Sequence, residues 1–111
     1  MSESPRPLDA LEKTIAARAA SPSQKSYTTQ LLVGGVERIG AKIVEEAAEV
    51  VEAAGEPGDI GREHLVREAA DLLYHLLVLL RHRDSSLGDV EAELARRAGV
   101  SGLVEKASRK K

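Results

Sequence analysis

Two pairs of acidic residues share one spacing, and they are the side chains in this sequence best suited to chemistry. Glu46 and Glu49 are three residues apart, and Glu68 and Asp71 repeat that spacing farther along the chain. On a helix, residues three apart lie on one face, with Cβ atoms about 5–6 Å from each other. Four carboxylates in one place repel and cannot all stay ionised without compensating charge. Because Mg²⁺ prefers oxygen ligands, the pattern predicts a magnesium site.

A magnesium ion held by these carboxylates would keep coordination positions open for phosphate oxygens. It could neutralise a polyphosphate and lower the pKa of a bound water. A second interpretation stays open, in which the acids form ordinary surface ion pairs with Lys42, Arg38 or Arg67. Lys42, one helical turn before Glu46, could pair with that carboxylate or reach a phosphate.

Two long amphipathic segments must position the acids, one over residues 36–54 that ends at Gly55 and one over residues 62–83. The apolar positions are Ile39, Ile43, Ala47, Val50, Val51 and Ala54 in the first, and a leucine-rich run from Leu65 to Leu80 in the second. In each segment the acidic pair follows one flank of the apolar face. Packing the two apolar faces together therefore brings the acidic flanks face to face. His64 and His75 share the second flank, where a histidine is either a ligand or a hydrogen-bonding residue at the core boundary.

Capping and helix-ending residues divide the rest of the chain. The expected N-terminal caps are Ser26 and two capping boxes, Asp9 with Glu12 and Ser86 with Asp89. The expected ends are Pro22, Gly34 with Gly35, Gly55 and Gly99. These signals add a first helix, a short helix over residues 27–33 and a last helix. No segment alternates like a strand, so the sequence predicts an all-α fold.

The composition restricts the fold and excludes several functions. Phe and Trp are absent and there are only two Tyr, so the core must be aliphatic, and aromatic surfaces that stack nucleic-acid bases are not expected. The absence of Cys excludes disulfides, thiolate zinc sites and a cysteine nucleophile. A net charge of −2 argues against general nucleic-acid binding.

The chain length allows one domain over residues 1–111, with a basic tail over about 101–111. A chain this small buries only about 60–70% of its unfolded surface, so a partner subunit would help. The N-terminus lacks the pattern of a secretory signal, and the longest apolar run, Leu76 to Leu80, is too short to cross a bilayer. We therefore expect no membrane contact and a cytoplasmic location.

Two strings around the acids resemble a known family. They are KIVEEAAEVV over residues 42–51 and EAADLLYHLLVLL over residues 68–80. Together they resemble the phosphoribosyl-ATP pyrophosphatases, within the wider group of MazG-like all-α nucleoside-triphosphate pyrophosphatases. The wider group carries ExxE and then ExxD on adjacent helices, whereas the DLLYHLLVLL run and the segment Ser26-Tyr27-Thr28 point to the histidine-pathway family. The resemblance covers nearly the whole chain.

The resemblance implies hydrolysis of a small nucleotide, phosphoribosyl-ATP, to phosphoribosyl-AMP and pyrophosphate, the second step of histidine biosynthesis. It implies Mg²⁺ ligation by Glu46, Glu49, Glu68 and Asp71, with Glu45 as an additional ligand or behind the ligands. Glu45 or Glu49 would accept a proton from the attacking water. Substrate contacts would come from Tyr27, Thr28, Arg38, Lys42 and His75. It also implies a MazG-like helical bundle whose four-helix core is completed by a homodimer.

The sequence departs from the family's pattern at two positions. The family often has Lys-Lys and then Gly before its Glu-Glu, but this chain has Ala41 at one Lys position and Val44 at the Gly position. One cation and one closely approaching glycine are therefore missing from the expected phosphate contacts. Two alternatives stay open: a house-cleaning pyrophosphatase that acts on dUTP or non-standard nucleotides, and a non-catalytic helical dimerisation module with solvated acids.

Overall fold

The structure, a computed structural model, describes residues 6–98, and within that range the chain is helical with no strand. The four helices are α1 (Pro7–Ala20), α2 (Tyr27–Ala54), α3 (Gly58–His82) and α4 (Leu87–Arg97). The predicted all-α fold is confirmed. None of the described helices is long and apolar enough to span a membrane. The basic tail expected over about 101–111 lies outside the described residues.

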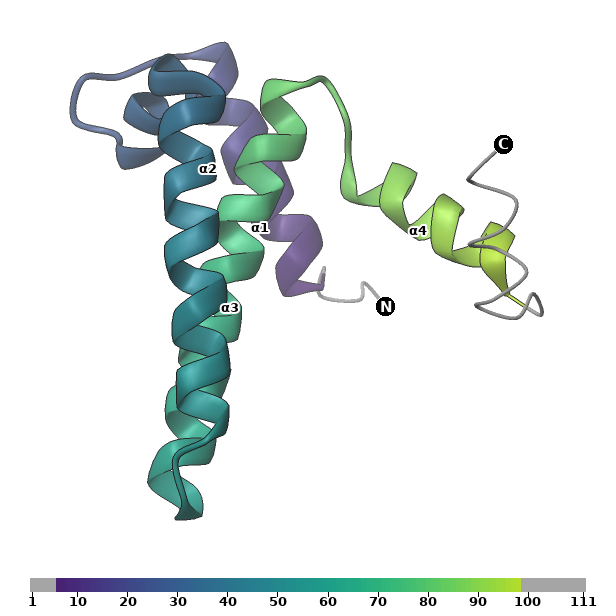
Figure 1. Ribbon diagram of the computed structural model, residues 1–111. Helices are drawn as coiled ribbons and strands as arrows, with labels where there is room; N and C mark the ends of the chain where they lie inside the picture. The colour runs from purple at the N-terminus through teal and green to yellow at the C-terminus, as the bar shows by residue number, and fades with distance from the viewer. Residues whose placement is uncertain (1–5, 99–111) are drawn as a thin grey trace, which may run out of the picture.

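Helices α2 and α3 form a long antiparallel pair, α1 lies against one half of it, and α4 extends away from the pair (Figure 1). The core lies where α1 covers the pair. Its buried members are Ile15, Leu31, Ile39, Leu77 and Val78. This core is entirely aliphatic, as the composition predicts. The other half of the pair consists of two helices alone, so no other described helix covers its outer faces.

Helix α2 begins as predicted and bends where the sequence suggests an end. The hydroxyl of Ser26 accepts a hydrogen bond from the backbone N–H of Thr29 at 3.1 Å. At Gly35 the backbone takes φ 70° and ψ −159°, a conformation that favours glycine, and helical structure then resumes at once. The predicted boundary at Gly34 and Gly35 is therefore a sharp bend inside α2 rather than a loop between two helices.

The first predicted capping box is wrong and the second is confirmed. Helix α1 begins at Pro7, because a proline needs no N–H partner in the first turn, and Arg6 at the cap makes no side-chain bond. Glu12 instead accepts a hydrogen bond from the backbone N–H of Leu87 at 2.6 Å, which ties α1 to the start of α4. In α4, Ser86 and Asp89 each bond the other's backbone N–H, at 3.1 and 3.0 Å.

Helix α3 begins at Gly58, four residues before the predicted start at Arg62, and it ends at His82, one residue before the predicted end. A close approach in its first turn allows the early start. A Cβ atom at Gly61 would collide with the carbonyl group of Glu56 in the preceding turn. Only glycine lets the chain fold back this tightly, and the tight turn leaves Glu56 beside the first turns of α3.

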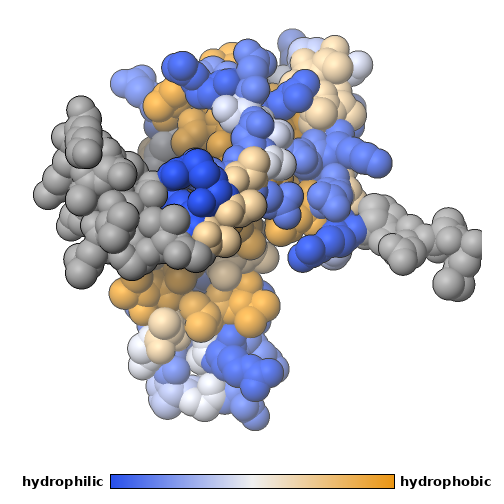
Figure 2. All heavy atoms as spheres, turned by 90° about the vertical axis from the view of Figure 1, so that its right-hand side faces the viewer, coloured by the Kyte–Doolittle hydropathy of each residue, from blue (hydrophilic) through white to orange (hydrophobic). Residues whose placement is uncertain are grey.

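The predicted apolar faces are only partly buried. Ile39 is fully buried, but in the single chain Val51 is 73% exposed and Ala54 is also exposed. On α3, Leu77 is buried, whereas other large apolar residues of the same helix stay exposed: Ile60, Val66, Leu73 and Leu76. Figure 2 shows hydrophobic surface over the half of the α2–α3 pair that α1 does not cover. The reason is architectural, since α1 is too short to cover the whole pair.

Candidate active site

The acidic flanks of α2 and α3 meet as predicted. One carboxylate oxygen from each of Glu46, Glu68 and Asp71 lies within 4.8 Å of the other two. Glu46 is buried, Glu68 is half-buried and Asp71 is exposed, so the cluster reaches from the core boundary to solvent. This graded burial is not that of a solvated helix face, which is the alternative interpretation of the acidic spacing.

The fourth predicted ligand, Glu49, is joined to the cluster through a neighbour. A hydrogen bond with Glu68 raises the pKa of Glu49, and loss of hydration and the negative charge of Glu68 act in the same direction. Glu45 is placed differently. Its carboxylate accepts a hydrogen bond from Lys42 Nζ at 3.2 Å on the exposed side of α2. Glu49 therefore interacts with the cluster through Glu68, although its oxygens are not among the three that converge, and Glu45 is paired with Lys42.

The negative charge of the cluster is only partly compensated by neighbouring residues. Loss of hydration raises the pKa of Glu46, and the charges of Asp71 and Glu68 raise it further, against the opposing effects of His75 and Lys42. Oε2 of Glu68 is buried without a hydrogen-bond partner among the described residues, and Oε1 of Glu46 is buried against Nδ1 of His75. Leaving a buried polar atom unpaired costs about 1–3 kcal/mol, more for a charged group. An all-oxygen set with an unpaired buried oxygen on Glu68 fits a hard divalent cation.

His75 connects the acids to the first turn of α2. Its Nδ1 lies 3.0 Å from the backbone carbonyl oxygen of Asp71 and forms an ion pair with Glu46. Because a carbonyl only accepts, Nδ1 carries a proton, and Nε2 lies within hydrogen-bond distance of the Tyr27 hydroxyl, at 2.9 Å. Both ring nitrogens of this buried histidine are therefore occupied by protein groups.

A second pair of residues strengthens the same connection. The hydroxyl groups of Thr28 and Tyr74 are 2.5 Å apart, and the rings of Tyr27 and Tyr74 stack with centroids 6.2 Å apart. Tyr74 also contacts the ring of His75 edge-on, at a centroid distance of 4.9 Å. The first turn of α2 is thus fixed against α3 beside the acids.

His64 contacts Glu68 on the side of the cluster nearer to the turn between α2 and α3. Its Nδ1 lies 2.8 Å from Glu56 Oε1, and its Nε2 lies 3.3 Å from Glu68 Oε1. The hydrogen bond with Glu56 raises the pKa of His64 and so favours its cationic form. A positive His64 would hold one oxygen of Glu68 and leave the orphaned oxygen facing the cluster.

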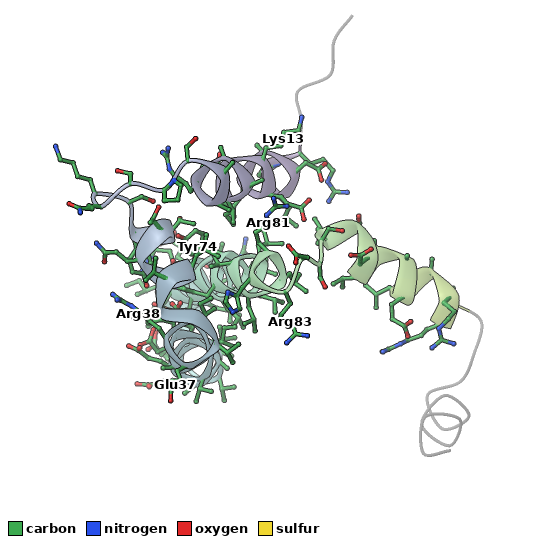
Figure 3. All side chains as sticks on the ribbon, turned by 90° about the horizontal axis from the view of Figure 1, so that it is seen from above. Lys13, Glu37, Arg38, Tyr74, Arg81 and Arg83 are labelled. Carbon is green, nitrogen blue, oxygen red and sulfur yellow. The ribbon has the colours of Figure 1, made fainter. Side chains whose placement is uncertain are left out.

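The two predicted cations lie at the solvent side of the site. Arg38 and Lys42 are one helical turn apart on α2, and Arg38 points away from α4 (Figure 3). Burial raises the pKa of Tyr27, whereas the charges of Lys42 and Arg38 lower it, which places both cations near this hydroxyl. The arrangement combines an acidic cluster that reaches from the core boundary to solvent, a hydrogen-bonded aromatic pair and two cations at the solvent side, which suits a metal-bound polyphosphate.

Comparison with known proteins identifies the family. Residues 8–98 match the family described as Phosphoribosyl-ATP pyrophosphohydrolase. The chain belongs to this family. It is 57% identical over 109 residues to the Phosphoribosyl-ATP pyrophosphatase of Rhodopirellula baltica, across 98% of this chain and 91% of the relative. It is 53% identical over 100 residues to Phosphoribosyl-ATP pyrophosphatase 1 of Bradyrhizobium diazoefficiens, across 90% of this chain and 92% of the relative.

Membership of the phosphoribosyl-ATP pyrophosphohydrolase family confirms the predicted resemblance and makes the chain a hydrolase. The match includes all four helices and both acidic pairs. Sequence reasoning missed the roles of Tyr74 and Glu56. The four-residue spacing between His64 and Glu68 could have predicted the contact between these two residues. No spacing rule connects His64 to Glu56, which lies in the turn after α2.

Proposed function

We propose that this chain hydrolyses phosphoribosyl-ATP to phosphoribosyl-AMP and pyrophosphate, the second step of histidine biosynthesis. Relatives that share about half of its residues over nearly their whole length are named for this activity. The observation in the structure that supports it most is the meeting of Glu46, Glu68 and Asp71, with a buried oxygen of Glu68 that lacks a hydrogen-bond partner among the described residues. A nucleotide polyphosphate brought there would meet both the acids and the exposed cations.

The residues that would hold Mg²⁺ are Glu46, Glu49, Glu68 and Asp71. Their support is the all-oxygen chemistry of the set and the unpaired buried oxygen of Glu68. Bound Mg²⁺ would supply charge neutralisation for the phosphate chain. His64 and His75 would keep Glu68 and Glu46 oriented, because each histidine is itself fixed by a second protein group.

Glu49 is the better of the two predicted proton acceptors. A carboxylate with a raised pKa is a stronger base, and Glu49 has one because of Glu68. Glu45 is held by Lys42 and lies outside the acidic cluster. We therefore assign to Glu49 the acceptance of a proton from the attacking water. Lys42 and Arg38 would face the phosphate oxygens at the solvent side and stabilise the departing pyrophosphate.

Of the other predicted substrate residues, one would contact the nucleotide and two would orient neighbouring side chains. Tyr27 is partly exposed, so its ring can contact the nucleotide while its hydroxyl bonds His75. Thr28 and His75 are buried and bonded within the protein, and so would orient Tyr27 and Glu46. We also propose that the enzyme is a homodimer, in which the uncovered faces of α2 and α3 are buried. A cytoplasmic location remains an expectation from the sequence.

Pyrophosphate release tests this function. We expect turnover of phosphoribosyl-ATP to exceed that of ATP or dUTP and to stop when a chelator is added. Glu49→Gln should lower the rate by about 100-fold or more, because the proton acceptor is lost. The matched control Glu37→Gln changes an exposed glutamate of the same helix that points away from α1 (Figure 3) and should keep full activity. A preference for dUTP, or full activity of Glu49→Gln with intact helical circular dichroism, would contradict the assignment.

A further inference from the structure

A polar cavity of about 400 Å³ lies between α1, the α1–α2 connection and the first turn of α2. Two cations line it, Arg18 from α1 and Lys25 from the connection, together with serine, threonine and tyrosine residues. No acidic side chain lines this cavity. Its chemistry is therefore opposite to that of the carboxylate cluster between α2 and α3.

The positive charge in the cavity is unbalanced. Within residues 6–98, the side chains of Arg18 and Lys25 have no ion pair and no hydrogen bond. The first turn of α2 contains no acidic residue, so the positive end of the helical segment before the Gly35 bend adds to the same field. Ser23 already accepts a hydrogen bond from the backbone N–H of Lys25, which holds the connection in shape. Two unpaired cations and the hydroxyl groups of Ser23 and Ser26, which remain able to donate, suit a phosphate monoester.

The cavity is connected to the acidic cluster through two side chains. Tyr27 and Thr28 line the cavity, and the Tyr27 hydroxyl lies 2.9 Å from His75 Nε2. The ring of His75 in turn forms the ion pair with Glu46. A ligand that occupies both places would therefore pass across Tyr27, whose ring is 42% exposed and can contact it.

The proposed substrate has negative groups at two ends. Its triphosphate is the part that the acids and Mg²⁺ would take, and its added ribose carries a separate phosphate monoester that needs cations elsewhere. We propose that the cavity of Arg18 and Lys25 binds this phosphate monoester and thereby distinguishes phosphoribosyl-ATP from ATP. The inference rests on the proposed function and adds the residues that would determine its specificity.

Kinetics of Arg18→Gln, Lys25→Gln and the double variant test this subsite. The KM for phosphoribosyl-ATP should rise about tenfold or more in each, with kcat little changed, because charge-assisted hydrogen bonds to the phosphate are lost. The slower release of pyrophosphate from ATP should not change, since ATP lacks this group. Lys13→Gln is the matched control, because Lys13 lies on α1 outside the cavity and points away from α2 and α3 (Figure 3).

A binding measurement separates the subsite from the reaction. Ribose 5-phosphate, titrated into metal-free protein and followed by nuclear magnetic resonance, should shift signals of the α1–α2 connection in the wild type but not in the double variant. Inorganic phosphate should bind more weakly, because it lacks the ribose. An unchanged KM in the double variant of an active enzyme would overturn the subsite and leave the proposed function intact. An equal loss with ATP would also overturn it, and a wild type inactive on phosphoribosyl-ATP would instead overturn the proposed function.

Discussion

Opposing electrostatic effects act on the carboxylate of Glu46. Its carboxylate is buried, pairs with His75 and lies beside Asp71 and Glu68. Loss of hydration and the two neighbouring negative charges raise its pKa. A raised pKa means that the folded protein disfavours the ionised form relative to the unfolded chain. Without a metal, the negative charge of Glu46 therefore destabilises the fold that positions it.

The raised pKa of Glu46 determines how the stability of the metal-free protein changes with pH. The contribution of Glu46 is most favourable below its ordinary pKa of 4.5 and becomes less favourable as the pH rises through the raised value. Metal-free Glu46→Gln should therefore be more stable than the wild type at neutral pH, by about 1 kcal/mol, and should lose this advantage below pH 4.5. Urea unfolding in chelator across this range measures the difference. Glu37→Gln, the exposed control, should show no such gain, and a less stable Glu46→Gln at neutral pH would contradict the interpretation.

At the scale of helices, most caps and ends could be predicted from short sequence patterns, and each exception has a cause within the same few residues. Ser26 and the Ser86–Asp89 box cap their helices because a side-chain oxygen can bond an N–H within the same turn. The Asp9–Glu12 pattern fails because Pro7 starts α1 earlier. The two glycines before residue 36 give a bend, since sequence alone does not say whether helical bonding resumes after a positive φ.

The meeting of α2 and α3 explains how much of the site could be predicted. The spacing of each acidic pair and the flank it follows are properties of one helix, so the acidic cluster was predictable. The contacts that orient it are not local: Tyr27 and His75 are 48 residues apart, and Thr28 and Tyr74 are 46 apart. Those partners depend on where the Gly35 bend directs the first turn of α2, which no periodicity specifies.

At the scale of the molecule, one chain leaves too much apolar surface uncovered. Large apolar side chains along the α2–α3 pair stay exposed, including Val44, Val51, Val66 and Leu73. Figure 2 shows this surface over the half of the pair that α1 does not cover. Exposed apolar surface of this extent is typical of an interface rather than of a monomer. A second copy with the same face would bury it around a twofold axis.

Sedimentation of the full chain tests the homodimer. We expect twice the chain mass of 11.9 kDa at working concentrations. Val66→Glu places a charge on the uncovered face and should shift the protein to monomer with its helical circular dichroism retained. Val33→Glu is the matched control, because Val33 is equally an exposed valine but lies in the part of α2 before the bend. A concentration-independent monomer for the wild type, or equal effects of both variants, would contradict the homodimer.

Magnesium binding is the measurement on which the enzymatic account depends most directly. Calorimetric titration of Mg²⁺ into the wild type and into Glu37→Gln should give the same saturable heat. The double variant Glu46→Gln with Asp71→Asn should give none, because one ligand from each helix of the cluster is lost while the fold is retained. Unchanged Mg²⁺ binding by the double variant, or no binding by the wild type, would show that the carboxylates shared by α2 and α3 do not form the metal site.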